Sequence, residues 1–177
     1  MKILAISGSA RRASTNTALL KAMQALAPDG MALTVFDSIA ALPVFSPDDE
    51  AERTPAAVQE LLAQVALADG VIICSPEYVR AIPGGMKNAI DWMVSRDEII
   101  SKPIALAHAS HRGDDMLESL RLVLATVSTR FLPHHFLRIG LIGKSPEEVA
   151  ALLMQPEYKT QVTAFLHAFA EEIAPRR

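Results

Sequence analysis

Two polar loops hold the residues of this chain that could bind a ligand. The first, residues 8–17, reads Gly-Ser-Ala-Arg-Arg-Ala-Ser-Thr-Asn-Thr and combines hydroxyls, one amide and two guanidiniums. It contains neither the G-x-G-x-x-G dinucleotide pattern nor the Walker A lysine. Because a helix is expected directly after it, these donors add to free backbone N–H groups and to the positive end of the helix dipole. We therefore predict a phosphate site. The alternative is a plain turn in which Ser14 or Thr15 caps the helix.

The second loop follows a short apolar run at residues 71–74 and begins Ser-Pro-Glu-Tyr at residue 75. Pro76 ends the strand, because proline has no N–H to donate to a sheet. Open α/β sheets bind their ligands at the carboxyl ends of strands. We therefore predict that this loop contributes to a binding site and is more than a connection.

The two loops are embedded in a chain whose expected strands and helices alternate. This alternation predicts right-handed βαβ units and a parallel sheet covered on both faces. We expect one flavodoxin-like α/β domain over residues 1–177, with five parallel strands in the order 2-1-3-4-5. Thr54 is the expected N-cap of the second helix, and Ser145 that of a late one. The expected strands are 3–6, 33–36, 71–74, 103–109 and 136–142, and the expected helices are 15–27, 55–67, 86–94, 116–128, one starting at 145, and 159–173.

The order 2-1-3-4-5 brings the two polar loops together, because the first and third strands are neighbours at the point where the strand order reverses. A phosphate on the first loop would leave its attached ring on the second. There Pro76 and Glu77 offer backbone groups to a heteroaromatic edge, and Tyr78 offers an apolar face. This arrangement suits flavin mononucleotide (FMN).

The motifs in these loops resemble those of the NADPH-dependent FMN reductase family, flavodoxin-like proteins that include quinone, chromate and azo reductases. The matching pieces are Gly-Ser-x-Arg-x-x-Ser-x-Asn at 8–16, Leu-Pro-Val-Phe at 42–45, Pro-Glu-Tyr at 76–78, and Pro-Gly-x-x-Lys-Asn-Ala-Ile-Asp-Trp at 83–92. The resemblance implies reduction of a small electrophilic acceptor, such as a quinone, by NAD(P)H through bound FMN. It also implies a homodimer or homotetramer.

The resemblance further implies which residues hold the cofactor. The chain departs from the family in two places: Val79 and Arg80 replace a frequent Asn-Gly pair, and Ser110-His111 opens a loop that is glycine-rich in many members. We still predict flavin contacts from Val79, Ser110 and His111, although His111 could also be solvated. The residues predicted to bind the phosphate are Ser9, Arg11, Ser14, Asn16 and Thr17, and those predicted to line the ring are Pro76, Glu77 and Tyr78.

No side chain is predicted to act as a catalytic acid, base or nucleophile, because flavin supplies the redox chemistry. Two other readings stay open: a flavodoxin-like carrier of single electrons, and a binding module that has lost turnover. A net charge of −3 and only 9 aromatic residues argue against the carrier.

Composition excludes several other functions. The basic residues form no stripe, so nucleic acid is not an expected partner. The single cysteine, Cys74, cannot form an intrachain disulfide and is expected to be a small buried hydrophobe. Adjacent His134 and His135 would point to opposite faces of a strand, so no metal site is expected. With no apolar run long enough for a signal peptide or a membrane span, we expect a cytoplasmic protein.

Overall fold

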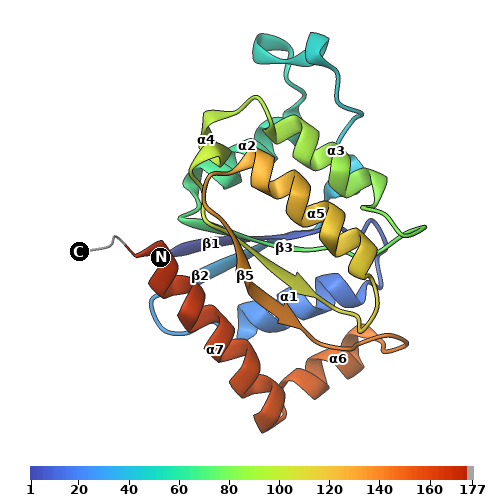
Figure 1. The fold of residues 1–177 in the computed structure, drawn as a ribbon, viewed down its shortest axis with the longest axis vertical. Helices are drawn as coiled ribbons and strands as arrows, with labels where there is room; N and C mark the ends of the chain where they lie inside the picture. The colour runs from blue at the N-terminus through green and yellow to red at the C-terminus, as the bar shows by residue number, and fades with distance from the viewer. Residues whose placement is uncertain (175–177) are drawn as a thin grey trace.

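A five-stranded parallel sheet forms the centre of the computed structural model, which describes residues 1–174 (Figure 1). The strand order is β2-β1-β3-β4-β5, so the predicted flavodoxin-like order is confirmed. The strands are β1 (Lys2–Ser7), β2 (Ala32–Phe36), β3 (Gly70–Cys74), β4 (Ile104–His108) and β5 (Phe131–Arg138).

Helices cover both faces of this sheet, and the side-chain period of two assigns each strand residue to one of two cores. Leu4, Ile73 and Leu106 pack under α2, α3 and α5. Ala5 and Ile72 pack on the opposite face under α1, α6 and α7. The helices are α1 (Thr15–Ala25), α2 (Ala56–Leu67), α3 (Gly84–Met93), the short α4 (Asp97–Ile100), α5 (Asp114–Val127), α6 (Pro146–Leu153) and α7 (Pro156–Ile173).

Two local expectations are wrong. β5 begins at Phe131 rather than at residue 136, and its register against β4 shifts between Ile104 and Leu106. Thr54 does not cap α2, because the helix starts at Ala56 with Pro55 at the N-cap position. The Thr54 hydroxyl instead donates to the carbonyl of Ala51 at 2.8 Å and accepts from Arg96 at 3.0 Å. The expected cap at Ser145 is confirmed: its side chain accepts from the backbone N–H of Glu148 and forms a capping box with it.

The motif at residues 83–92 anchors the long connection between β2 and α2. The side chain of Asn88 accepts from the N–H of Phe45 at 2.8 Å and donates to the carbonyl of Pro43 at 2.9 Å. Trp92, fully buried, donates to the same carbonyl and packs edge-on against Phe45. Before this anchor the connection contains the 3₁₀ helix η1 (Ile39–Ala41), whose Ile39 is buried in the core. Beyond it the connection projects from the body of the molecule (cyan in Figure 1) and contains the short 3₁₀ helices η2 (Pro47–Asp49) and η3 (Ala51–Arg53).

The first loop lies directly against the end of β3. The N–H of Gly8 donates to the carbonyl of Cys74 at 2.8 Å. A Cβ at Gly8 would lie 2.5 Å from Ser75 Oγ and 2.9 Å from its Cα. Only glycine therefore allows this approach. Within residues 1–174, no helix combines the length and the apolar character needed to cross a membrane.

We predict that Gly8→Ala destabilises the protein by about 1–3 kcal/mol, because the added methyl group overlaps backbone and must separate the two loops. Urea unfolding measures the change. Gly84→Ala is the matched control, since nothing lies within 4 Å of its Cβ position. Equal stability of Gly8→Ala and wild type would contradict the close approach.

Candidate functional site

The two predicted loops converge on one cavity at the carboxyl edge of the sheet. Its volume is about 270 Å³. The first helix, the loop after β3 and the loop after β4 all contribute to its wall. The lining residues are Thr15, Asn16, Pro76, Glu77, His108, Ala109, Ser110, Arg112, Gly113 and Ile142.

Hydroxyls of the first loop accept hydrogen bonds from the backbone of the same loop and of the helix start. Ser14 Oγ accepts from the N–H of Thr17 at 3.3 Å, so Ser14 does cap α1. Ser9 Oγ accepts from the N–H of Arg11 at 3.3 Å. Thr17 Oγ1 is hydrogen bonded to Ser7 Oγ at 2.7 Å. Since each hydroxyl also has a hydrogen to donate, Ser9 and Ser14 keep a donor for an anion.

The start of α1 is electrostatically suited to an anion. Its first turn contains no acidic residue that would compete with one. Arg11 and Arg12 are exposed and line a neighbouring hollow of about 280 Å³ with Ala10, Thr17 and Asp37. The positive end of the helix dipole and the two guanidiniums therefore belong to one loop and the helix start that follows it, with Asp37 also bordering the hollow.

The second loop forms a tight turn with an unusual backbone. Tyr78 and Ala81 exchange two backbone hydrogen bonds of 3.2 and 3.0 Å. The two central residues, Val79 and Arg80, have φ values of 53° and 59°. Such a turn favours Asn-Gly, and a β-branched residue in the left-handed region is strained. Val79 is also 98% exposed, so no packing of its side chain offsets this strain.

Three polar contacts hold this turn and its surroundings against the start of α5. Arg80 pairs with Asp115 in a short hydrogen-bonded contact that lowers the pKa of that carboxyl. Glu77 Oε2 accepts from the N–H of Met116 at 3.2 Å and so satisfies a free donor of α5. Arg138 on β5 pairs with Asp114 at 2.5 Å. The Glu77 carboxylate is thus directed to the helix.

His108, the last residue of β4, links the loop after β3 to the loop after β4, and both loops line the cavity. It is 1% exposed. Its Nε2 lies 2.6 Å from the carbonyl oxygen of Arg112, and its Nδ1 lies 3.1 Å from that of Ser75. Burial lowers the pKa of this imidazole, so the neutral form has one N–H for two carbonyl acceptors. Sequence reasoning missed His108; the signal was one polar residue ending an otherwise apolar strand.

The structure brings together only part of the predicted cofactor-binding set. Asn16, Pro76, Glu77 and Ser110 line the cavity. Tyr78 is half exposed and Val79 almost fully exposed, and neither lines the cavity. The predicted residues that do not line it are Ser9, Arg11, Ser14, Thr17, Tyr78, Val79 and His111, and their contacts with a cofactor stay predictions.

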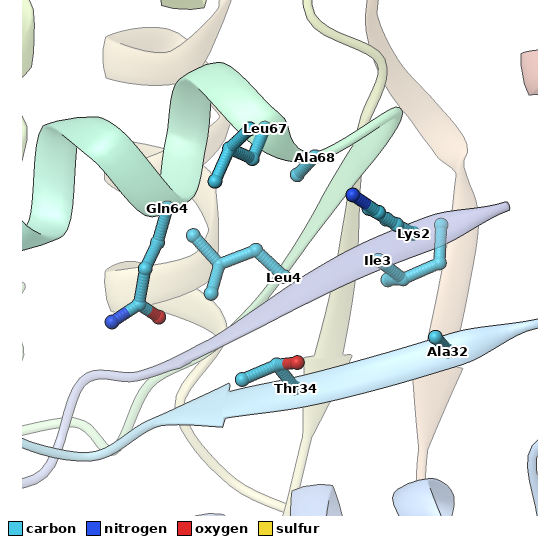
Figure 2. A pocket seen from close by; sticks show the side chains of 8 residues that line it. All are labelled: Lys2, Ile3, Leu4, Ala32, Thr34, Gln64, Leu67 and Ala68. Atoms are coloured by element: carbon cyan, nitrogen blue, oxygen red, sulfur yellow. The ribbon is translucent and has the colours of Figure 1, made fainter.

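A second hollow lies at the opposite end of the sheet and does not meet these loops. Figure 2 shows Gln64 and Leu67 of α2 above Leu4 and Thr34 on the two neighbouring strands. Its volume is about 250 Å³, and its walls are mainly apolar, with Lys2 as their cation. It lies at the amino ends of the strands, away from the crevice where such sheets bind ligands.

The fold and the crevice at its switch point define a flavodoxin-like protein. Comparison with known proteins then identifies the family. The sequence profile described as NADPH-dependent FMN reductase matches residues 1–141. The chain belongs to this family, whose members use FMN with NAD(P)H as the electron donor.

Individual relatives agree with this assignment. A quinone reductase of Escherichia coli K12 is 34% identical over 113 residues, which are 62% of this chain and 60% of that protein. The chain thus matches about 60% of the length of such relatives. An NADPH azoreductase of Bacillus sp. OY1-2 is 32% identical over 145 residues, 80% of this chain and 78% of that protein. Among solved structures, FerB, a flavoenzyme NAD(P)H:(acceptor) oxidoreductase of Paracoccus denitrificans, has the same fold. The two structures superimpose with a TM-score of 0.73 at 23% sequence identity. The match covers 97% of this chain and 98% of the FerB chain.

We predict that Val79→Asn stabilises the protein by about 1 kcal/mol, because asparagine tolerates the left-handed backbone better than valine. The measurement is the free energy of unfolding in urea. Val44→Asn serves as the control, since Val44 is 85% exposed and has no positive φ. That control should change stability by less than about 0.5 kcal/mol. Destabilisation by Val79→Asn would argue against the strained turn.

We predict a pH dependence of stability that originates at His108. Burial lowers its pKa in the folded protein, so below about pH 6.5 the unfolded chain binds a proton that the native state does not. Stability contributed by the neutral imidazole should therefore decrease as the pH falls from 7.5 to 5.5. Unfolding free energies should fall less steeply in His108→Gln than in wild type. His134→Gln, exposed on β5, should keep the wild-type slope.

Proposed function

We propose that this chain binds FMN in the crevice and uses it to reduce small electrophilic acceptors with NAD(P)H. Quinones are the favoured acceptors, and azo, nitro and chromate compounds belong to the same class. The observation that carries the proposal is the convergence of an anion-binding helix start with the Pro76–Tyr78 loop at the switch point, in a chain of the FMN reductase family. Relatives named quinone reductase and azoreductase support the activity.

In this proposal the phosphate of FMN lies at the start of α1. Asn16 lines the cavity there, and Arg11 lies on the adjoining loop. The donors fit a dianion, because amide, hydroxyl and guanidinium hydrogens meet the positive end of a helix with no carboxylate in its first turn. We assign the phosphate to Ser9, Arg11, Ser14, Asn16 and Thr17, as the motif implies.

The ring is proposed to lie on the second loop. Pro76 and Glu77 line the cavity beside Ser110, so their backbone groups are available to the edge of the ring. Tyr78, Val79 and His111 are assigned to its outer margin. When bound there, FMN would supply the hydride-transfer chemistry between the nicotinamide and the acceptor.

The side chains around the cavity position groups and do not transfer protons. The Glu77 carboxylate accepts from the start of α5, and His108 lies between two carbonyls. Neither is placed as a free acid or base. The protein's part is therefore to hold the two rings together and to exclude water.

We further propose that the protein is cytoplasmic, that residues 1–177 are one domain, and that copies associate as a dimer or tetramer. Residues 175–177 lie outside the described part. Support for association comes from the projecting connection. It exposes Val44 beside a hollow of about 500 Å³ that is lined by η1 and the start of α3.

The proposal is tested by titrating the purified protein with FMN and with riboflavin, which lacks the phosphate. Arg11→Ala should raise the dissociation constant for FMN about tenfold or more, since a hydrogen bond to a charged group contributes about 1.5–3 kcal/mol. Affinity for riboflavin should not change. Arg53→Ala, on η3, is the charge-matched control.

Turnover is measured with the FMN-loaded protein, a simple benzoquinone and either NADPH or NADH under anaerobic conditions. Oxidation of the nicotinamide that depends on both FMN and quinone is expected. Wild-type protein that binds neither flavin would overturn the proposal. Flavin binding without nicotinamide oxidation would favour the binding module instead.

A further inference from the structure

We propose that Cys74 is a positioning residue of the anion site: its thiol fixes the orientation of the Asn16 carboxamide, so that the amide N–H groups face the cavity. The inference rests on the proposed function, because the anion is taken to be the phosphate of FMN. It goes beyond that function by giving a role to a cysteine that sequence reasoning treats as a small hydrophobe.

Cys74 occupies the centre of the carboxyl edge of the sheet. It is the last residue of β3 and is fully buried. Its Sγ donates to Asn16 Oδ1 at 3.2 Å, and the sulfur is also hydrogen bonded to the backbone of Ala109 after β4. Its own carbonyl accepts from Gly8. One residue therefore contacts the first loop, the start of α1 and the end of β4.

The direction of the hydrogen bond follows from the protonation state of the thiol. Burial raises the pKa of Cys74 far above its ordinary value, because a thiolate would be poorly solvated there. The group therefore keeps its S–H at neutral pH. A permanent donor at this position requires an acceptor opposite it, and the carboxamide oxygen of Asn16 is that acceptor.

This contact determines what Asn16 presents to the cavity. A carboxamide has one oxygen acceptor and two N–H donors, and the two ends exchange when the group flips. With Oδ1 bound to the thiol, Nδ2 makes no hydrogen bond within residues 1–174. Nδ2 is nevertheless not among the buried unpaired atoms of that part. Since Asn16 is only 6% exposed and lines the cavity, its amide hydrogens open onto the crevice.

The opposite orientation would be unfavourable for an anion. A flipped Asn16 would direct its oxygen at the phosphate and its N–H groups at the sulfur. Within residues 1–174, the S–H is the one hydrogen-bond partner of this carboxamide. The thiol thus contributes to affinity without touching the ligand.

The test compares Cys74→Ser, which keeps a hydrogen-bond donor, with Cys74→Ala and Cys74→Val, which remove it. In the Ala and Val variants the dissociation constant for FMN should rise about fivefold, the scale of one ordinary hydrogen bond. Riboflavin affinity should stay as in wild type. Cys74→Ser should restore FMN affinity to within about twofold. Valine fills more of the space of the cysteine side chain than alanine does. A loss of FMN affinity in Cys74→Ala alone would therefore indicate the cavity left by the smaller side chain.

A second readout does not need the cofactor. In the apo protein, the side-chain ¹⁵N–H₂ resonances of Asn16 should form one dispersed pair in wild type and Cys74→Ser. In Cys74→Ala and Cys74→Val they should broaden or double. If wild type binds no FMN, the proposed function fails, but these resonances still test the contact.

The proposal is overturned if the Ala and Val variants bind FMN as tightly as wild type. It is also overturned if Cys74→Ser, Ala and Val all lose FMN and riboflavin equally, since that pattern indicates general damage to the fold. A double-mutant cycle with Asn16→Ala gives the final check. Removing the thiol should have no further effect on FMN affinity once the carboxamide is absent.

Discussion

The close approach of the first loop to the end of β3 is the contact on which the rest of the crevice depends. Gly8 donates to the Cys74 carbonyl and leaves no room for a Cβ against Ser75. This contact places the start of α1 beside the loop that follows β3. An anion at the helix start and a ring on the second loop can then belong to one molecule. A larger residue at position 8 would separate these two halves, whatever donors each one kept.

The position of the cavity at the carboxyl edge of the sheet explains why so many polar groups near it already have hydrogen-bond partners. Loops at strand ends expose backbone groups that need partners when they are buried. His108 meets the carbonyls of Ser75 and Arg112, and Glu77 satisfies a free N–H of α5. Because Arg80 is tied to Asp115, the turn keeps a conformation that Val79 disfavours. His108 and Glu77 thus make the cavity wall rigid, although their residue types are ones that can act as acids and bases.

Strand order and the convergence of the two polar loops could be predicted from the sequence, because both depend on local patterns. Apolar runs of strand length and an alternation with helices specify the sheet, and Pro76 marks where β3 ends. The start of β5 was missed, since Pro133 and exposed His134 interrupt its apolar pattern at an edge of the sheet. The cap expected at Thr54 failed because Pro55 takes the N-cap position, and the Thr54 hydroxyl oxygen accepts from Arg96 instead. The roles of His108 and Cys74 depend on partners more than 30 residues away in the chain, and no local pattern encodes such contacts.

Under the proposed function, these features explain how one scaffold serves different acceptors. Residues of the proposed anion site are buried and tied to several elements, as Asn16 and Cys74 are. Residues at the margin, Tyr78 and Val79, are exposed and make few side-chain contacts. Changes at the margin therefore alter what can approach the ring without disturbing the anion site. Because hydride transfer needs proximity of two rings and no protein proton carrier, such changes leave the chemistry itself intact. Acceptor preference should accordingly be determined at the exposed turn, and cofactor affinity at the buried end of the crevice.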